Sequence, residues 1–434
     1  MKFAFCTLGC KVNQYETQAM EQLLRAAGHT LGSFSEVCDC YIINTCTVTA
    51  TGDKKSRNMI RRARKCSPDA VIGVCGCYTQ LRPEDAEAVG ADVVSGTGDR
   101  RGFLDAMLRT AEDRQRRRLT DDARSRREFE ILPAGGLAER TRAMLKVEDG
   151  CDNFCTYCII PFTRGPVRSL PLADAVGQAQ TLAAEGYREL VVTGIEISSW
   201  GRDLPGSPTL TELLESLCAA VPDTRIRLGS LEPRTVTEEF CRRLCGFGNL
   251  CPQFHLSLQS GSDAVLRRMH RKYDTARYRE SVRLLGQYFP GCAVTTDLIV
   301  GFPGESEEEF AESLEFIGEC GLAAVHVFPY SRRSGTYAAK LPGQLGNAEK
   351  ERRSALACAK AAELSERYRT AMVGTVQEVL FEQDDGEFST GHAKNSVLCY
   401  LRGAGRHNEL LRVRVSALRA DGVEAELPDA HCEK

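Results

Sequence analysis

Strand-like and helix-like segments alternate along most of this chain. In the first series, apolar stretches such as 2–6 and 40–44 alternate with helical segments, and a second series of six units runs from Met144 to about Tyr330. A βαβα series predicts a parallel sheet covered by helices. We therefore expect an α/β protein with an N-terminal doubly wound parallel sheet and a central partial barrel of six β/α units.

The C-terminal part has a different pattern, which begins after a long predicted helix from Asn347 to Met372. Five short strand-like segments separated by turns predict a small antiparallel β-barrel, similar to an oligonucleotide/oligosaccharide-binding (OB) fold. Such barrels often bind RNA, although a domain that only packs on the central barrel is the alternative. We expect the following divisions: an N-terminal domain at 1–113, a charged linker at 114–140, the central barrel at 141–371 and the C-terminal barrel at 372–434.

Composition places these domains in a folded cytoplasmic protein. The chain has 434 residues, 42% of them hydrophobic, and a formal net charge of −3. No apolar run is long enough to span a bilayer, and the first residues read as a strand and not as a signal peptide. The 20 cysteines are therefore expected to be reduced thiols or metal ligands.

Three closely spaced cysteines follow the first strand of the second series, at Cys151, Cys155 and Cys158. Three thiolates suit a cubane iron–sulfur cluster that leaves one iron open to another ligand. A structural zinc site needs four ligands, but the next cysteine is Cys218 and no histidine lies nearby. We expect a reactive cluster, at the end of the barrel where active sites collect.

Three other cysteines, Cys10, Cys46 and Cys77, each fall just past the carboxyl end of a predicted strand of the first series. In open α/β sheets these strand ends line one binding crevice. The three thiols either converge as ligands of a second cluster or are unrelated thiols of a cysteine-rich chain. Cys6 and Cys75 lie inside their strands, where we expect burial.

Basic segments lie beside these elements. The arginine-rich linker is expected to be a solvated connector and not a surface for nucleic acid. For the basic helix at 52–65, which follows Cys46, a phosphate-contacting face and a plain solvent face are both open. Arg332 and Arg333 either contact substrate or are surface charges, and the second is the simpler interpretation.

The motifs together resemble the radical S-adenosylmethionine (SAM) methylthiotransferase family over nearly the whole chain. The matching segments are TLGCKVNQYET, NTCTVT, GCYTQ, GCDNFCTYCIIPFTRG, GFPGES and FPYSRRSGTYA. The resemblance implies a C-terminal TRAM domain and two 4Fe–4S clusters. It carries the SAM-binding cluster onto Cys151, Cys155 and Cys158, and an auxiliary cluster onto Cys10, Cys46 and Cys77.

The chemistry that this resemblance implies uses SAM twice, as methyl donor and as source of a 5′-deoxyadenosyl radical. A methylthio group then replaces hydrogen on an unactivated carbon. An electron donor and a sulfur donor are implied partners. Tyr157, Glu196 in the TGIE segment and Ser230 are assigned to the SAM pocket. Like Ser230, the other polar residues at the strand ends either line this pocket or form structural hydrogen bonds at the barrel rim: Glu232, Gln259, Ser260 and Asp297.

Three branches of the family differ in substrate. The segments around Cys10 and Cys151 look most like the MtaB-type branch, which acts on C2 of N6-threonylcarbamoyladenosine at position 37 of tRNA. The implied partner is a tRNA anticodon loop, whose splayed bases suit recognition by stacking. The alternatives are isopentenyladenosine in tRNA, an aspartate of a ribosomal protein, or a non-enzymatic RNA-binding iron–sulfur protein.

Overall fold

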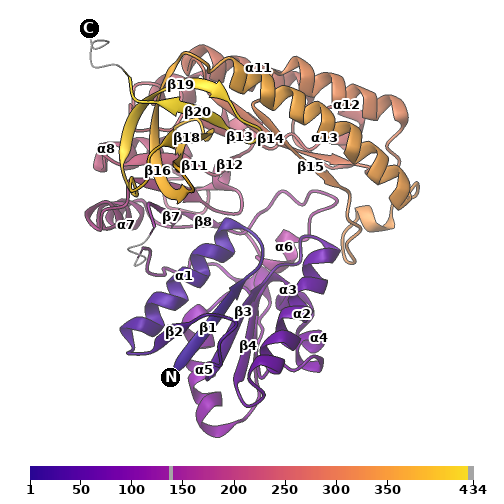
Figure 1. The fold of residues 1–434 in the computed structure, drawn as a ribbon. Coiled ribbons are helices and arrows are strands. Elements are labelled where there is room, and N and C mark those ends of the chain that lie inside the picture. The colour runs from indigo at the N-terminus through magenta and orange to yellow at the C-terminus, as the bar shows by residue number, and fades with distance from the viewer. Residues whose placement is uncertain (136–139, 429–434) are drawn as a thin grey trace.

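The computed structural model describes residues 1–135 and 140–428, apart from the side chain of Ala50. Three parts are visible in Figure 1: an α/β domain drawn in indigo and purple, a larger α/β part above it, and a yellow β-barrel beside the larger part. This is the architecture that the sequence predicts. Among the described residues, none of the helices combines the length and apolar character needed to cross a bilayer.

The N-terminal domain is a parallel six-stranded sheet in the order β2-β1-β3-β4-β5-β6. Helices lie on both of its faces, because α1 and α5 bury apolar residues against one face and α2 to α4 against the other. Its elements are β1 (Lys2–Thr7), α1 (Lys11–Ala26), β2 (Thr30–Gly32), β3 (Cys40–Thr45), α2 (Ala50–Cys66), β4 (Val71–Gly76), α3 (Cys77–Leu81), α4 (Pro83–Ala88), β5 (Val93–Ser95), α5 (Arg100–Asp113) and β6 (Arg117–Leu119).

The predicted linker is more ordered than expected. Strand β6, inside the range 114–140, pairs in parallel with β5 and extends the sheet. Its Arg118 forms ion pairs with Glu84 and Glu87. These contacts attach the segment to the domain, so it is not a free, solvated connector. A short 3₁₀ turn, η1 (Ala123–Ser125), follows, and 136–139 lie outside the described residues.

The central part is an open barrel of six strand positions. One sheet has the order β11-β10-β7 and the other β12-β13-β14-β15, all pairs parallel. Since β11 runs directly into β12, the two sheets form one curved wall. Its elements are β7 (Arg142–Lys146), β8 (Glu148–Asp149), α6 (Ile160–Thr163), β9 (Arg168–Ser169), α7 (Leu172–Ala184), β10 (Glu189–Thr193), η2 (Ile197–Ser199), α8 (Leu210–Ala220), β11 (Arg225–Leu228), β12 (Ser230–Leu231), η3 (Pro233–Thr235), α9 (Glu238–Leu244), β13 (Gln253–Leu256), α10 (Asp263–Arg268), α11 (Thr275–Tyr288), β14 (Ala293–Val300), α12 (Glu307–Glu319), β15 (Ala324–Pro329) and η4 (Ala338–Lys340).

Alternation along the barrel strands separates two environments. Leu145, Val192 and Leu228 belong to the apolar core under the outer helices, so their strand neighbours face the barrel lumen. Many of those neighbours are charged, among them Lys146 and Arg227, and both are buried. The lumen is therefore polar and the outer layer apolar, as a barrel with an internal active site requires.

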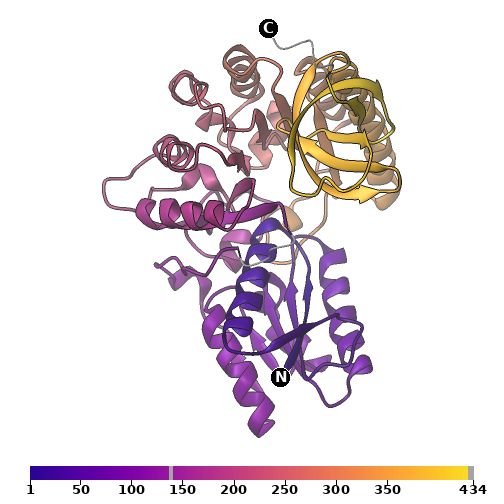
Figure 2. The same ribbon diagram turned by 60° about the vertical axis from the view of Figure 1, so that its left-hand side comes forward.

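The long helix α13 (Asn347–Thr370) packs along β15 and leads into the C-terminal barrel. Figure 2, turned by 60°, shows this barrel as a separate closed ring beside the central part. Its strand order is β16-β17-β18-β20-β19, and all pairs are antiparallel except β18 with β20. Its strands are β16 (Val376–Asp385), β17 (Phe388–Ala393), β18 (Leu398–Arg402), β19 (Leu410–Leu418) and β20 (Val423–Glu426).

Candidate active site

Three cysteines of the N-terminal domain come together at the carboxyl edge of its sheet. Cys10 precedes α1, Cys46 follows β3 and Cys77 begins α3. The close approach of the chain segments that carry these cysteines depends on two glycines with positive φ. A Cβ on Gly9 would lie 2.8 Å from Cys46 Cβ, and one on Gly76 would lie 2.4 Å from the Thr45 carbonyl oxygen. The convergence expected from the strand ends is thus present in the structure.

These three thiols influence one another electrostatically. Burial is the main cause of the raised pKa of Cys77, to about 11, and the neighbouring Cys10 and Cys46 raise it further. The Cys10 thiol also contacts Asn13 Oδ1 at 3.8 Å. Cys75, by contrast, is fully buried inside β4, as expected, whereas Cys6 is only half-buried.

The second cysteine group lies on the loop between β8 and α6, at the carboxyl end of β7. The loop is fixed by backbone hydrogen bonds from Cys151 N–H to Gly165 O and from Cys158 N–H to Cys155 O. Cys151, Cys155 and Cys158 are free, partly accessible thiols. Arg271 donates from Nη1 to Cys155 Sγ at 3.1 Å.

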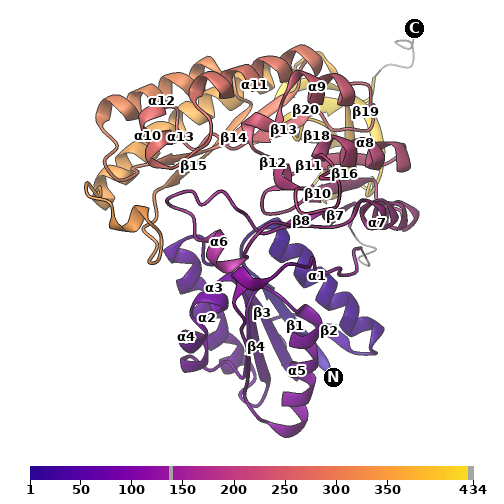
Figure 3. The same cartoon turned by 180° about the vertical axis from the view of Figure 1, so that it is seen from behind.

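The two groups face each other across the junction of the domains. Helix α3, which begins with Cys77, contacts α6 just past Cys158, and the view from behind in Figure 3 shows these two helices adjacent. Cys77 contributes to raising the pKa of Cys158 to about 12, after burial and Cys155. The described residues include no group of three or more His, Cys, Asp or Glu side chains that could hold a single metal ion. A cubane instead takes each thiolate on a different iron.

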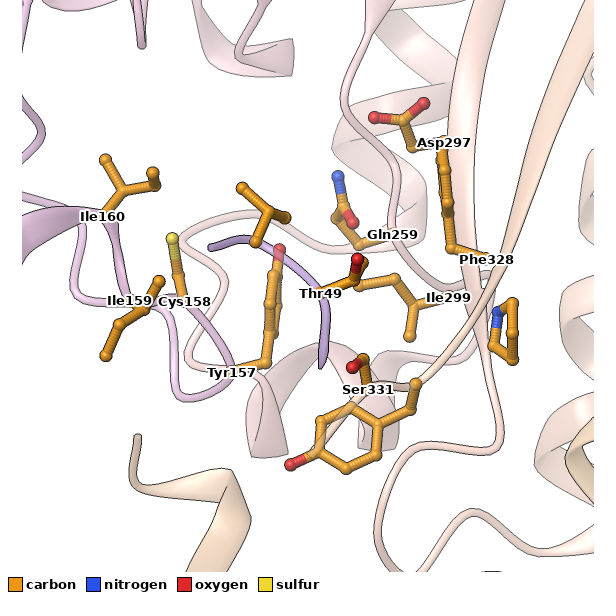
Figure 4. A pocket seen from close by; sticks show the side chains of 13 residues that line it. Thr49, Tyr157, Cys158, Ile159, Ile160, Gln259, Asp297, Ile299, Phe328 and Ser331 are labelled. Carbon is orange, nitrogen blue, oxygen red and sulfur yellow. The ribbon is translucent and has the colours of Figure 1, made fainter. Parts of the chain in front are cut away.

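A cavity of about 300 Å³ opens beside Cys158. Figure 4 shows Tyr157 and Cys158 on one side of it, with Gln259, Asp297 and Phe328 on the other. Thr49, from the loop after Cys46, closes a further side. The cavity is therefore bounded by both domains and both cysteine loops. Its mostly apolar wall with a few polar groups is typical of a small-molecule site.

Two family models match the chain. Residues 145–317 match the radical SAM superfamily and residues 2–96 match uncharacterized protein family UPF0004. The threonylcarbamoyladenosine tRNA methylthiotransferase MtaB of Bacillus subtilis is 41% identical over 407 residues, which cover 92% of this chain and 90% of the relative. The chain belongs to the radical SAM methylthiotransferase family.

A more distant relative and a solved structure also resemble the chain. The tRNA-2-methylthio-N(6)-dimethylallyladenosine synthase of Moorella thermoacetica is 31% identical over 98% of each chain. The radical SAM methyltransferase TsrM of Kitasatospora setae, solved with cobalamin and a [4Fe–4S] cluster, superposes with a TM-score of 0.57. Its identity is 16%, and it covers 78% of this chain and 73% of its own, so this likeness concerns the fold alone.

As a radical SAM methylthiotransferase, the protein uses SAM and [4Fe–4S] clusters. The two groups of three free thiols fit such clusters. Three thiolates are the donor set of a cubane cluster that leaves one iron open to another ligand.

Residues of the methylthiotransferase motifs other than the cysteines join the two domains. Arg164, from the motif of the second cysteine group, is fully buried and donates from Nη2 to Asn13 Oδ1 at 2.7 Å. It also forms ion pairs with Glu16 and Asp149. Arg100 binds the other oxygen of Glu16 at 2.8 Å. Although burial raises the pKa of Glu16, these cations hold it well below its usual range.

Arg333 forms a second connection, and the interpretation of it as a surface charge was wrong. It is buried and donates to Thr47 Oγ1 at 2.5 Å and to Asp53 Oδ2 at 2.8 Å. It is therefore not a surface charge. The sequence gives no sign of this partner, because the two residues are 280 positions apart. Arg332 donates to the carbonyl of Ala339 in its own loop.

The remaining residues expected in the SAM pocket fall into different places. Tyr157 lines the cavity, as do Gln259 and Asp297. Glu196 lies near Cys151 and raises the pKa of that thiol, although burial is the main cause. Its carboxylate also accepts hydrogen bonds from Ser198 N–H and Ser199 Oγ.

Three other strand-end residues lie away from the cavity wall. Ser230 is exposed on β12. Ser260 is fully buried against Ser313 Oγ at 3.2 Å, and Glu232 pairs with Arg234. The last two therefore have structural partners.

Proposed function

We propose that this methylthiotransferase adds a methylthio group to C2 of N6-threonylcarbamoyladenosine at position 37 of tRNA. The observation that carries the proposal is the 41% identity to the Bacillus subtilis MtaB enzyme, which extends over 92% of the chain. The relatives that act on dimethylallyladenosine are less similar, at 31% for the Moorella enzyme. The tRNA substrate in turn favours a cytoplasmic location.

We assign Cys151, Cys155 and Cys158 to the SAM-binding cluster, and Cys10, Cys46 and Cys77 to the auxiliary cluster. The free thiols and the two glycine-dependent close approaches support these ligand sets. When bound, the clusters and SAM supply the radical and the methylthio group, which is chemistry that side chains cannot perform.

The protein's own residues would then position the reactants. Arg271 would hold Cys155 in position through its 3.1 Å hydrogen bond to Sγ. Tyr157 would pack beside SAM in the cavity wall, and Glu196 and Ser230 remain proposed SAM contacts. The buried ion pairs of Arg164 and Arg333 fix the two cysteine loops relative to each other, so that both clusters would reach one substrate atom.

Several surfaces support RNA as the substrate. We propose that the C-terminal barrel is a TRAM domain that binds the tRNA. Helix α2, beside the Cys46 loop, exposes Lys54, Lys55 and Arg62, and none of these three side chains forms an ion pair with another described residue. Unpaired cations near an active site suit contacts with phosphate. An electron donor and a sulfur donor complete the proposed set of partners.

Anaerobic turnover tests the proposal. Reconstituted protein, SAM and a reductant would be incubated with tRNA carrying threonylcarbamoyladenosine and, separately, with tRNA carrying isopentenyladenosine. We expect the mass of a methylthio group on the first nucleoside only. Product on the second alone would assign the other tRNA branch. SAM cleavage without product on either would move the target to a protein side chain.

A further inference from the structure

A second cavity, of about 340 Å³, lies where all three parts of the molecule meet. It is separate from the cavity beside Cys158 and shares no residue with it. Helix α1, strands β7, β10 and β11, and the C-terminal barrel all contribute to its wall. The residues that matter below are Lys11, Gln18, Arg142, Arg227, Glu382 and His407.

This cavity opens on the lumen side of the barrel wall. Met144, Val191 and Arg227 line it, and each alternates with a residue of the apolar outer core. On α1, Lys11 and Gln18 are seven positions apart and therefore lie on one face of the helix. Lys11 directly follows Cys10, so the cavity begins one residue from a proposed ligand of the auxiliary cluster.

Two of the four cations that line the cavity, Arg142 and Arg227, already have acidic partners, whereas Lys11 and Arg140 form no ion pair with a described residue. Arg227 pairs with Glu189 at 2.6 Å, and Arg142 pairs with both Glu189 and Glu382. Glu382 also hydrogen-bonds to His392. The acidic groups of the wall thus already have cationic or hydrogen-bonding partners.

The side chain of Lys11 has no hydrogen bond or ion pair with any residue in the described part of the chain. Arg140, Arg142 and Arg227 line the same cavity. A cavity wall with four cationic residues is a site that an incoming anionic group would stabilise.

We propose that Lys11, supported by Arg142 and Arg227, binds the carboxylate of the threonylcarbamoyl group of the substrate nucleoside. This inference rests on the proposed function and deepens it. The threonylcarbamoyl substituent ends in an amino-acid carboxylate, whereas a dimethylallyl substituent is a hydrocarbon without a group for Lys11 to bind. Lys11 therefore contributes to the choice between the two modified adenosines.

Affinity measurements on matched tRNAs test this role. One tRNA would carry threonylcarbamoyladenosine at position 37 and the other, of the same sequence, unmodified adenosine. With both clusters loaded and SAM present, the wild-type protein should bind the modified tRNA about tenfold more tightly or better, as expected for a charge-assisted hydrogen bond. Lys11→Met should bring this ratio close to one, and Lys11→Arg should retain most of it.

A matched control separates loss of the specific contact from general loss of tRNA binding. Lys54→Met removes an exposed lysine of α2 outside the cavity, so it should weaken binding of both tRNAs equally and leave the ratio unchanged. A wild-type ratio near one, or an unchanged ratio in Lys11→Met, overturns the inference. Turnover is measured in parallel: absence of methylthio product with the wild-type protein on the modified tRNA counts against the proposed function itself, whatever the ratio.

Discussion

Arg164 and Glu16 form an ion pair in which both side chains are inaccessible to solvent, and it joins the central barrel to helix α1 of the N-terminal domain. Each residue belongs to a segment that also contains a proposed cluster ligand, since Arg164 follows Cys158 by six positions and Glu16 follows Cys10 by six. The relative position of the two cysteine groups therefore depends on a buried charge contact between their own motifs.

Removing Arg164 should destabilise the junction strongly. In Arg164→Met, Glu16 and Asp149 lose a buried cation, and breaking a buried pair in this way costs about 3–5 kcal/mol. We expect a lower unfolding midpoint in denaturant and reduced iron loading of the auxiliary site. Arg109→Met, at an exposed position of α5, is the control and should leave both measurements unchanged. Equal stability of the two variants would show that the contact has no such role.

Single replacements should separate the two clusters by their tasks. In Cys46→Ala, we expect SAM cleavage to 5′-deoxyadenosine to continue while methylthio product is lost. In Cys155→Ala, both activities should be lost, and iron analysis should show one cluster missing in each variant. Cys245→Ala removes an exposed thiol and should behave as wild type. Methylthio product from Cys46→Ala would contradict the ligand assignment.

Arg271 should tune the SAM-binding cluster. Its guanidinium group donates to Cys155 Sγ, and a cation at a cluster sulfur favours the more negative, reduced state. Arg271→Met should therefore lower the reduction potential by on the order of 60 mV, the equivalent of about 1.4 kcal/mol for one electron. A redox titration followed by electron paramagnetic resonance measures this, with Arg271→Lys expected to lie between the two. A potential that rises or stays constant would exclude the contact as a determinant.

Binding of tRNA should depend on salt, and part of that dependence should come from α2. Each phosphate contact adds about 0.7–0.9 to the slope of log affinity against log salt. The double variant Lys54→Gln, Lys55→Gln should reduce this slope by about 1.4–1.8, and the affinity should fall for all tRNAs alike. Arg283→Gln alters an arginine that is also exposed but is paired with Glu280, and its slope should match the wild type. An unchanged slope in the α2 variant would indicate that the exposed face of α2 contacts solvent and not phosphate.

The sequence predicted much of the fold because its signals were local. Strand and helix alternation identified both α/β series, and the positions of Cys10, Cys46 and Cys77 past strand ends made their convergence one of two interpretations. The register of β6 was missed, since a short strand of arginines carries no apolar alternation. Its Arg117 pairs with Asp113 at the end of α5, and its Arg118 pairs with Glu84 and Glu87 in α4.

Contacts between distant segments could not be predicted from the sequence, because no local signal indicates them. Arg333 and Arg164 read as ordinary surface arginines or motif residues, because nothing in their own segments shows the acidic partners on α1 and α2. Lys11 shows the opposite case. Nothing in the sequence distinguishes it from other lysines, and only the structure shows that it lines one cavity together with Arg142 and Arg227.

The spacing of the two cysteine groups also bears on how the protein matures. Cys151, Cys155 and Cys158 lie on one short loop, so a nascent chain that has formed little more than this loop already presents all three thiols. Cys10, Cys46 and Cys77 approach one another only when β1, β3 and β4 are paired in register. With the proposed ligands, insertion of the auxiliary cluster must wait for the N-terminal sheet, and the order in which iron is delivered follows from the order of folding.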